Sequence, residues 1–347
     1  MRVLLTGHLG YIGTVMAPLL LERGHDVVGL DSHLFERCTF GPGFQDIETI
    51  LTDVRDVRQD MFEGFDAVLH LAGLSNDPMG DLNPQLTDDI NHKASVRIAE
   101  LAKAAGVERF IFSSSCSNYG AGGQDFLDET SEFNPVTPYG QSKVDTELDV
   151  SEMADDRFSP VFMRSATAYG YSPRIRFDLV ANNLTAWAFC TGKIMMKSDG
   201  TPWRPIVHIE DISRAFIAAL EAPRDVVHKQ AFNVGRTDEN YRIREIAEMV
   251  GDVVPDCEIS FADGAGPDKR NYRVNCDKIR EVLPAFEPKW TVREGIKQLY
   301  EMYKEIGLKL EEFEGDRFQR LAHLKHLMST DVLADDLRHA PGSGRGR

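Results

Sequence analysis

Tyr139 and Lys143 are the residues of this chain whose types and spacing most clearly suggest chemistry. They lie four positions apart, downstream of the hydroxyl-rich run Ser113–Ser115. On a helix, residues i and i+4 share a face, so the Lys143 ammonium would lie beside the Tyr139 phenol. A free phenol has a pKa of about 10, and a neighbouring positive charge lowers it. We therefore expect Tyr139 to act as a base that removes a proton from a substrate hydroxyl.

Three glycines near the start of the chain are spaced for binding a dinucleotide. A short apolar strand runs into Gly7, Gly10 and Gly13, and a helix-compatible segment follows. In such sites the glycines allow a tight turn, close approach of the backbone to a diphosphate, and packing of the helix on the strand. The next strand ends at Asp31, where a carboxylate accepts a ribose 2′-hydroxyl and repels a 2′-phosphate. The pattern predicts an NAD(H) site.

These motifs require a scaffold of alternating strands and helices. Up to about residue 165 the chain alternates in this way, which is typical of an α/β fold with a doubly wound parallel sheet. Beyond that point the elements are shorter and are separated by Gly and Pro. We expect a Rossmann-type NAD-binding domain over residues 1–165 with returning segments near 205–235, a smaller mixed substrate domain over 166–306, and a C-terminal extension with a flexible tail over 307–347.

Composition limits the classes of partner. The 347 residues carry a net charge of −16, which argues against non-specific nucleic-acid binding because that depends on Lys and Arg clusters. No apolar run approaches the length of a membrane span, and five widely spaced cysteines without a C-x-x-C pair indicate reduced thiols. We expect a cytoplasmic protein without a membrane segment. Any anionic ligand would need a locally positive pocket.

The segments Thr6–Gly13 and Tyr139–Lys143 together resemble the extended short-chain dehydrogenase/reductase family, in its NAD-dependent nucleotide-sugar epimerase and dehydratase branch. The resemblance covers residues 1 to about 305. It implies that Asp53 meets the adenine, that the turn Leu71–Gly73 lies under the nicotinamide ribose, and that Ser115 is the catalytic hydroxyl. The cofactor-binding residues predicted from motif and resemblance are Gly7, Leu9, Gly10, Tyr11, Ile12, Gly13, Asp31, Asp53, Val54, Leu71, Ala72, Gly73, Asn91 and Lys143.

The substrate implied by the resemblance is a nucleotide sugar. Its binding residues are predicted to be Ser75, Ser115, Asn182, Asn183, Arg204 and Arg270, with Arg273 as an alternative to Arg270. Arginine suits a diphosphate because its planar fork donates to two oxygens at once. The resemblance also implies a homodimer formed through the helices near residues 85–105 and 139–153. The Asp88–Asp89 and Glu147–Asp149 charges on these helices are interpreted as solvated.

Departures from the family pattern distinguish between possible reactions. In sugar dehydratases an Asp-Glu pair follows the catalytic hydroxyl, and decarboxylases keep the Glu, whereas this chain has Cys116 and Ser117. Thr167 replaces an Asn of many 4-epimerases. The prediction is an NAD-dependent epimerase with a 4-keto intermediate. Cys116 is a candidate acid/base for inverting a carbon next to the ketone, or else a small buried packing residue.

Alternative functions remain open at this point. A dehydrogenase or reductase with net redox chemistry would use the same Tyr139, Lys143 and Ser115, and a dehydratase would add elimination chemistry. A non-catalytic NAD-binding scaffold is the remote alternative, because such a protein has no reason to retain the Tyr and Lys.

Overall fold

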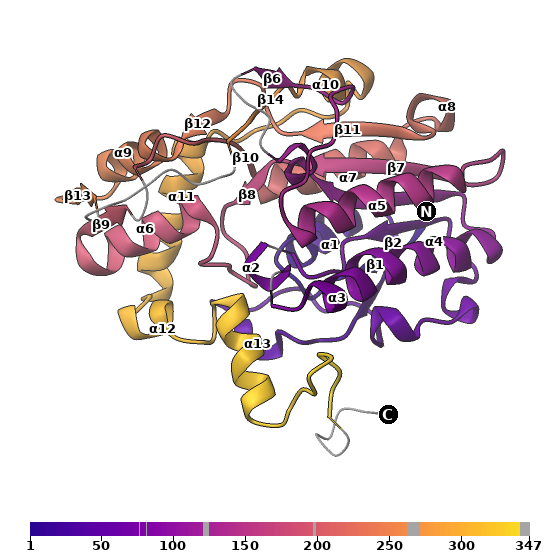
Figure 1. Cartoon of the computed structure of the whole chain (residues 1–347), viewed down its shortest axis with the longest axis horizontal. Coiled ribbons are helices and arrows are strands. Elements are labelled where there is room, and N and C mark those ends of the chain that lie inside the picture. The colour runs from indigo at the N-terminus through magenta and orange to yellow at the C-terminus, as the bar shows by residue number, and fades with distance from the viewer. Residues whose placement is uncertain (76, 81, 121–124, 197–198, 262–270, 341–347) are drawn as a thin grey trace.

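The computed structural model describes residues 1–75, 77–80, 82–120, 125–196, 199–261 and 271–340. Its largest element is a seven-stranded parallel sheet in the order β11-β7-β5-β4-β1-β2-β3 (Figure 1). The strands are β1 (Arg2–Thr6), β2 (Asp26–Asp31), β3 (Thr49–Leu51), β4 (Ala67–His70), β5 (Arg109–Ser115), β7 (Ser159–Ser165) and β11 (Gln230–Val234). The order reverses between β1 and β4, and a crevice forms at such a point beyond the carboxyl ends of the strands. The predicted Rossmann-type fold is confirmed.

Helices cover both faces of this sheet, so its central strands are apolar on both sides. Val3 and Leu5 of β1 pack into one hydrophobic cluster, and Leu4 packs into the cluster on the other face. The first cluster is covered by α1 (Gly13–Glu22), α7 (Ile209–Glu221), α8 (Arg224–Val227) and α10 (Asp277–Val282). The second is covered by α2 (Asp77–Gly80), α3 (Pro84–Thr87), the π-helix η4 (Asp88–Lys93), α4 (Ala94–Ala104) and α5 (Pro138–Glu152).

A second lobe of short elements lies at the left of Figure 1 and has its own apolar cluster. It contains a three-stranded sheet in the order β12-β10-β8 and the strand pair β13-β9. Its elements are β8 (Thr167–Tyr169), α6 (Val180–Thr191), β9 (Lys193–Met196), β10 (Trp203–His208), β12 (Asn240–Arg242), α9 (Ile243–Val253), β13 (Glu258–Phe261) and α11 (Val292–Ile306). The pair β14 (Arg273–Val274) and β6 (Phe126–Leu127) joins segments far apart in sequence.

The chain returns to the large sheet at α7 and β11, and again at α10 and α13 (Arg320–Ser329). Strand β10 pairs with β8 and β12 and so belongs to the second lobe. The next helix, α7, buries Ile212 and Phe216 against the large sheet, and β11 pairs with β7 at its edge. The connections in the described part of the chain include four short 3-10 helices: η1 (Glu36–Cys38), η2 (Val54–Asp56), η3 (Gln59–Phe62) and η5 (Cys116–Tyr119).

The C-terminal extension is largely packed. After α12 (Leu310–Glu314), the helix α13 (Arg320–Ser329) and a bridge between Leu333 and His339 lie against the first lobe (Figure 1). Leu324, Leu327 and Leu337 belong to the same apolar cluster as strand β1 and helix α4. The predicted flexible tail, residues 341–347, lies outside the described residues. Within the part of the chain that is described, no helix is long and apolar enough to span a bilayer.

Candidate active site

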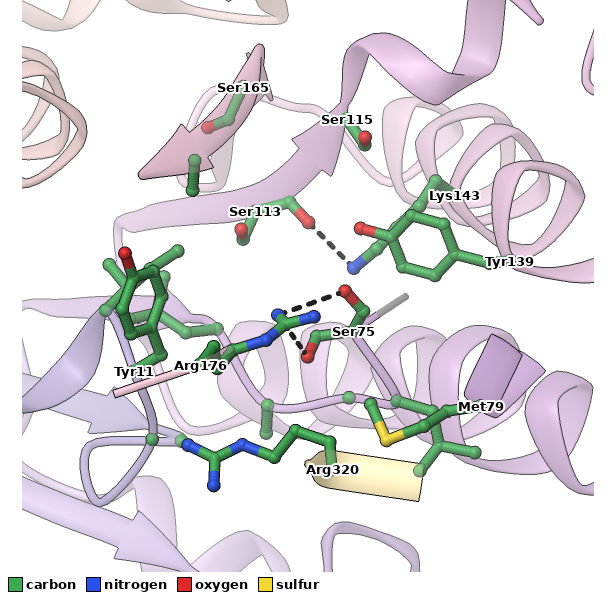
Figure 2. Close-up of a pocket in the computed structure, with 18 of the residues that line it drawn as sticks. Tyr11, Ser75, Met79, Ser113, Ser115, Tyr139, Lys143, Ser165, Arg176 and Arg320 are labelled. Carbon is green, nitrogen blue, oxygen red and sulfur yellow. Dashed lines mark hydrogen bonds between the residues drawn. The ribbon is translucent and has the colours of Figure 1, made fainter. Parts of the chain in front are cut away.

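A cavity of about 480 Å³ opens between the two lobes at the carboxyl ends of β1, β2, β4 and β5 (Figure 2). Its walls include the predicted residues Gly7, Gly10, Tyr11, Ile12, Gly13, Asp31, Asp53, Val54, Leu71, Ala72, Gly73, Ser75, Ser115, Tyr139, Lys143 and Arg204. Sequence motifs separated by more than a hundred residues therefore meet at one pocket.

The glycine-rich turn lies tightly against its neighbours. Gly7 has a φ of +73°, and a Cβ there would lie 2.8 Å from the Ala72 nitrogen. A Cβ on Gly13 would lie 2.4 Å from the Gly7 carbonyl oxygen. No side chain fits at either position, so the turn brings the amino end of α1 to the pocket. The first N–H groups of a helix have no acceptor within the helix and carry a partial positive charge, which favours an anion such as a diphosphate.

Two carboxylates line the pocket beyond this turn. Asp31 accepts the N–H of His33 at 2.7 Å and that of Leu9 at 3.1 Å. Burial raises the pKa of Asp31, and these hydrogen bonds oppose the shift. Leu9 itself does not line the pocket and contributes through its backbone. Asp53 caps η2 and forms an ion pair with Arg55 at 2.6 Å.

Tyr139, Lys143 and Ser115 lie together on the opposite wall (Figure 2). Thr137 caps α5 by accepting the Gly140 N–H, which sets the start of the helix carrying Tyr139 and Lys143. The Lys143 ammonium lies 5.7 Å from the centroid of the Tyr139 ring and donates to the Ser113 carbonyl oxygen at 2.8 Å. Ser115, at the end of β5, lines this wall, and its Oγ accepts the Ser117 N–H at 3.1 Å.

The expected low pKa of Tyr139 is wrong for the protein alone. Burial raises the pKa of Tyr139 to about 12, although the polar Ser115 side chain and the charge of Arg176 lower it. Burial also lowers the pKa of Lys143 to about 8. The helix spacing predicts the proximity of the two groups correctly, but desolvation disfavours the charged form of each. Additional positive charge near the phenol is needed for it to ionise.

Arg176 is a pocket residue that the sequence motifs do not identify. Its guanidinium donates to Ser75 Oγ at 2.9 Å and pairs with Asp178 at 2.6 Å (Figure 2). It lies close enough to Tyr139 to lower the pKa of that phenol. The available sequence signal was the pair Arg174 and Arg176 just after a Gly and Pro turn. Arg204 also lines the pocket, with its guanidinium over the Tyr272 ring at 6.0 Å.

Other predicted residues support the pocket from behind or lie elsewhere. Asn91 Oδ1 accepts the Leu74 N–H at 2.7 Å and its Nδ2 donates to the Leu74 carbonyl, so Asn91 holds the turn that lines the pocket. Asn182 donates to Tyr11 Oη and to the Arg176 carbonyl, and Asn183 donates to the Phe177 carbonyl. These three amide side chains hold neighbouring backbone segments and the Tyr11 hydroxyl in place, and none of them lines the cavity. Arg270 lies outside the described residues.

Cys116 lies in a packed cluster. Its thiol is 1% exposed, donates to the Arg164 carbonyl oxygen at 3.1 Å, and does not line the pocket. Burial raises the pKa of the Cys116 thiol well above its usual range. These contacts support the packing interpretation of Cys116 over the acid/base one. Ser117, in contrast, does line the pocket.

Glu147 corrects a second expectation, because it is buried and not solvated. Its carboxylate pairs with Arg164 at 2.7 Å and accepts hydrogen bonds from Asn118 and Ser114. Ser114 immediately precedes Ser115, so this buried ion pair fixes the end of the strand that carries the candidate hydroxyl. A carboxylate and a guanidinium with several hydrogen bonds each can be accommodated in a core.

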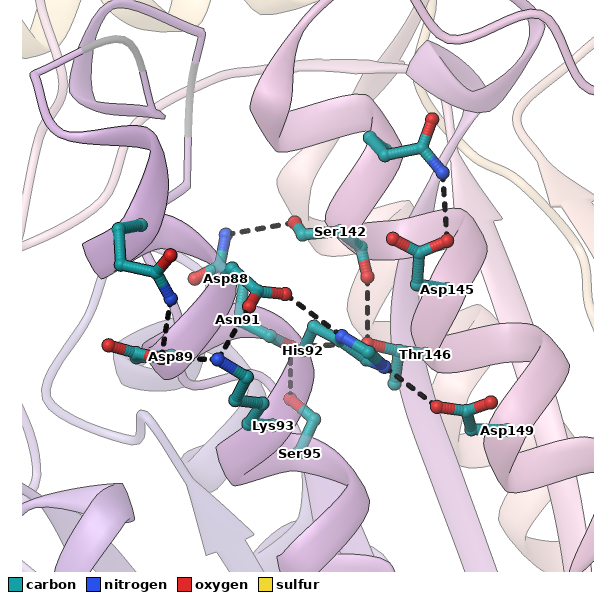
Figure 3. Close-up of polar contacts among 12 residues, drawn as sticks. Asp88, Asp89, Asn91, His92, Lys93, Ser95, Ser142, Asp145, Thr146 and Asp149 are labelled. Atoms are coloured by element: carbon teal, nitrogen blue, oxygen red, sulfur yellow. Dashed lines mark hydrogen bonds and ion pairs between the residues drawn. The ribbon is translucent and has the colours of Figure 1, made fainter.

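The helices predicted to form a dimer are linked to each other within the chain. His92 of η4 bridges Asp88 at 3.0 Å and Asp149 of α5 at 2.8 Å (Figure 3). Lys93 pairs with Asp88 and Asp89 on the same side. Leu148 is 55% exposed on α5. The homodimer stays a prediction.

The residues present fit NAD as cofactor. The glycine turn has no room for side chains and offers helix N–H groups to a diphosphate, and Asp31 is placed for a ribose hydroxyl. Leu71, Ala72 and Gly73 line the pocket between this turn and Tyr139. In the described part of the chain, no group of His, Cys, Asp and Glu side chains is arranged to hold a metal ion.

Comparison with known proteins agrees with this fit. A UDP-glucose 4-epimerase of Corynebacterium glutamicum is 29% identical over 268 residues, covering 73% of this chain and 80% of the relative. UDP-glucuronic acid decarboxylase 1 of Arabidopsis thaliana is 26% identical over 333 residues, covering 91% of this chain and 72% of the relative. The solved structure of MoeE5 with UDP-glucose and NAD aligns with a TM-score of 0.76 at 25% identity, over 88% of this chain and 99% of MoeE5.

A model of one family matches most of the chain. The NAD-dependent epimerase/dehydratase family model matches residues 3–235, which include the glycine-rich turn, Asp31, Ser115, Tyr139 and Lys143. Taken with the fold and the pocket, this match identifies the chain as a member of the NAD-dependent epimerase/dehydratase family, with NAD as its cofactor.

Proposed function

We propose that this protein is a nucleotide-sugar epimerase that works through transient oxidation at sugar C4. The observation that carries the proposal is the meeting of Tyr139, Lys143 and Ser115 at the pocket closed by the glycine-rich turn. Kinship to UDP-glucose 4-epimerases adds support. The cavity extends from this turn to Arg176 and Arg204, two guanidinium groups suited to the diphosphate of a nucleotide sugar.

In this mechanism Tyr139 removes the proton of the sugar 4-hydroxyl, and Ser115, which lines the same wall of the pocket, orients that hydroxyl. NAD⁺ held at the glycine-rich turn would supply the acceptor, and later the donor, of the C4 hydride. The Lys143 ammonium and the Arg176 guanidinium supply positive charge that stabilises the phenolate. After the 4-keto sugar turns over in the pocket, Tyr139 gives the proton back, so the protein ends the cycle unchanged.

The pocket argues against elimination chemistry. The family resemblance implies that dehydratases and decarboxylases use a carboxylate after the catalytic hydroxyl, and here Ser117 lines the pocket where that Glu is expected. A serine hydroxyl does not act as an acid or base near neutrality without a partner that activates it. The thiol of Cys116 is buried away from the cavity. With NAD bound, epimerisation needs neither a carboxylate nor a thiol at these two positions.

Tyr139→Phe tests the proposal. The variant removes the phenol oxygen and keeps the ring, so NAD affinity should stay within a factor of about two while turnover falls on the order of 10²- to 10⁴-fold. Tyr171→Phe is the matched control, because its hydroxyl donates to the Phe40 carbonyl outside the cavity. The assay incubates each protein with UDP-, GDP-, dTDP- and CDP-sugars in deuterated water.

The isotope pattern separates the candidate reactions. Inversion at C4 without deuterium in the sugar supports turnover of a ketone. Deuterium at C3 or C5 would indicate enolisation, and net formation of NADH or a dehydrated sugar would contradict epimerisation. Normal turnover by Tyr139→Phe would show that another group is the base.

A further inference from the structure

Arg320 reaches the cofactor pocket from outside the region that the family model matches. It is the first residue of α13 in the C-terminal extension, whereas the model ends at residue 235. The side chain is 2% exposed and lines the same cavity as Gly7, Gly10 and Tyr11. Figure 2 shows Arg320 entering from its helix on the same side of the pocket as Tyr11 and Arg176.

The Arg320 guanidinium is buried with few partners. Its Nη2 donates to the Arg174 carbonyl oxygen at 2.7 Å, and the group stacks over the Phe35 ring at 4.3 Å. Its Nη1 has no hydrogen-bond partner among the described residues. A buried positive charge with an unused donor is unfavourable unless an anion faces it. Burial accordingly lowers the pKa of Arg320 to about 10.

Of the two neighbouring arginines, Arg176 has a carboxylate partner, whereas Arg174, like Arg320, has backbone carbonyl acceptors and one buried nitrogen without a partner in the described part of the chain. Arg176 is paired with Asp178 at 2.6 Å. Arg174 donates through Nη1 to the carbonyl oxygens of Phe35 and Glu36. Within the described residues, Arg320 forms no ion pair with a carboxylate, and its charge is opposed only by Cys38 and by Asp178, which is itself paired with Arg176.

We propose that Arg320 binds a phosphate of the NAD diphosphate and that the C-terminal extension is therefore part of the cofactor site. The diphosphate belongs at the amino end of α1, and Arg320 shares that wall of the cavity with Gly10 and Tyr11. Arg320 lines the cavity, so its guanidinium can supply a charge-assisted hydrogen bond to a phosphate oxygen. The proposal depends on NAD binding alone and not on which sugar is converted.

A 2′-phosphate is a poorer ligand for this arginine. Asp31 lies at the end of β2, lines the pocket, and would repel a phosphate on the adenosine ribose. The C-terminal extension is also hydrogen-bonded to residues near the position expected for that ribose. His339 Nε2 is hydrogen-bonded to the Ser32 carbonyl at 3.0 Å, and Arg55 donates to the Asp336 carbonyl at 2.8 Å. These contacts hold the segment that follows α13 against the first lobe, where Leu337 lines the pocket.

The test compares nucleotide binding by Arg320→Gln, Lys325→Gln and unaltered full-length protein after bound nucleotide is removed. Lys325 is an exposed cation on the same helix and controls for loss of charge. Calorimetry measures the dissociation constants of NAD, ADP-ribose and adenosine. Loss of one charge-assisted contact predicts a rise of roughly 10- to 100-fold in the constants for NAD and ADP-ribose with Arg320→Gln. The constant for adenosine should change less than about twofold.

Several results would overturn the proposal. They are unchanged NAD affinity, an equal loss for adenosine, a gain in preference for NADP, or a loss confined to the nucleotide sugar. If Arg320→Gln does not fold, Arg320→Lys serves in the same comparison. The lysine keeps the charge but cannot hold the Arg174 carbonyl and a phosphate together, so a smaller loss of about 3- to 10-fold is expected. Unchanged affinity in that variant would equally refute the role.

Discussion

Replacement of Lys143 by Met should change the pH dependence of stability. Lys143 is 5% exposed, and burial lowers the pKa of its ammonium from 10.5 to about 8 in the folded protein. Between these values the unfolded chain binds more protons than the folded one, so the free energy of unfolding rises with pH. The folded protein carries the full penalty of the buried ammonium below pH 8 and loses it as the pH approaches 10.5.

The magnitude follows from the two pKa values. The pKa of Lys143 is 10.5 in the unfolded chain and about 8 in the folded protein. Proton linkage then raises the contribution of Lys143 to the free energy of unfolding by about 2 to 3 kcal/mol between pH 7 and pH 10. Lys143→Met has no such group, so the stability difference between the parent and the variant should shift by that amount in favour of the parent. Many other groups titrate in this range, but they cancel in the difference.

Urea unfolding of nucleotide-free protein at pH 7, 8, 9 and 10 measures this quantity. Exposed Lys325→Met is the control, because its ammonium is in water in both states. The reasoning fails if the difference between the parent and Lys143→Met stays within about 0.5 kcal/mol across the range, since one pKa unit corresponds to 1.36 kcal/mol. A shift of the opposite sign would mean that a partner stabilises the ammonium in the fold.

Three further substitutions test other parts of the site. Glu147→Gln leaves Arg164 buried without its counter-charge and should lower the free energy of unfolding by roughly 3 to 5 kcal/mol, measured by urea denaturation. Gly13→Ala forces a Cβ to within 2.4 Å of the Gly7 carbonyl, so NAD binding measured by calorimetry should be lost or strongly weakened. Cys116→Ser should change kcat less than about threefold, because the thiol packs away from the cavity; a loss of 100-fold would revive its acid/base role.

The parts of the site that the sequence predicts well are those fixed by local spacing. Gly7, Gly10 and Gly13 form one turn, and Tyr139 and Lys143 are one helical turn apart, so their mutual positions follow from short stretches of chain. The sheet is equally predictable, because its apolar strands alternate with helices. The order of its strands then brings both motifs to the same crevice.

Burial and long-range contacts explain the rest. In the sequence, Glu147 is one of several charged residues on an amphipathic helix. Only the tertiary structure shows that it is paired with Arg164. The raised pKa of Tyr139 depends on how much chain surrounds it, which spacing does not reveal. Arg176 follows an irregular turn and Arg320 follows a segment without a motif, so neither has a local pattern that points to the pocket.

The packing of the last described helix has a consequence for folding during synthesis. Leu324, Leu327 and Leu337 complete the apolar cluster that begins with Leu4 of the first strand. Domains tend to fold as they leave the ribosome, amino-terminal part first. Here the first lobe emerges early, but one of its apolar surfaces stays open to water until residues 324–337 have been translated. A nascent chain stalled before residue 320 would therefore expose a hydrophobic surface of the kind that chaperones bind.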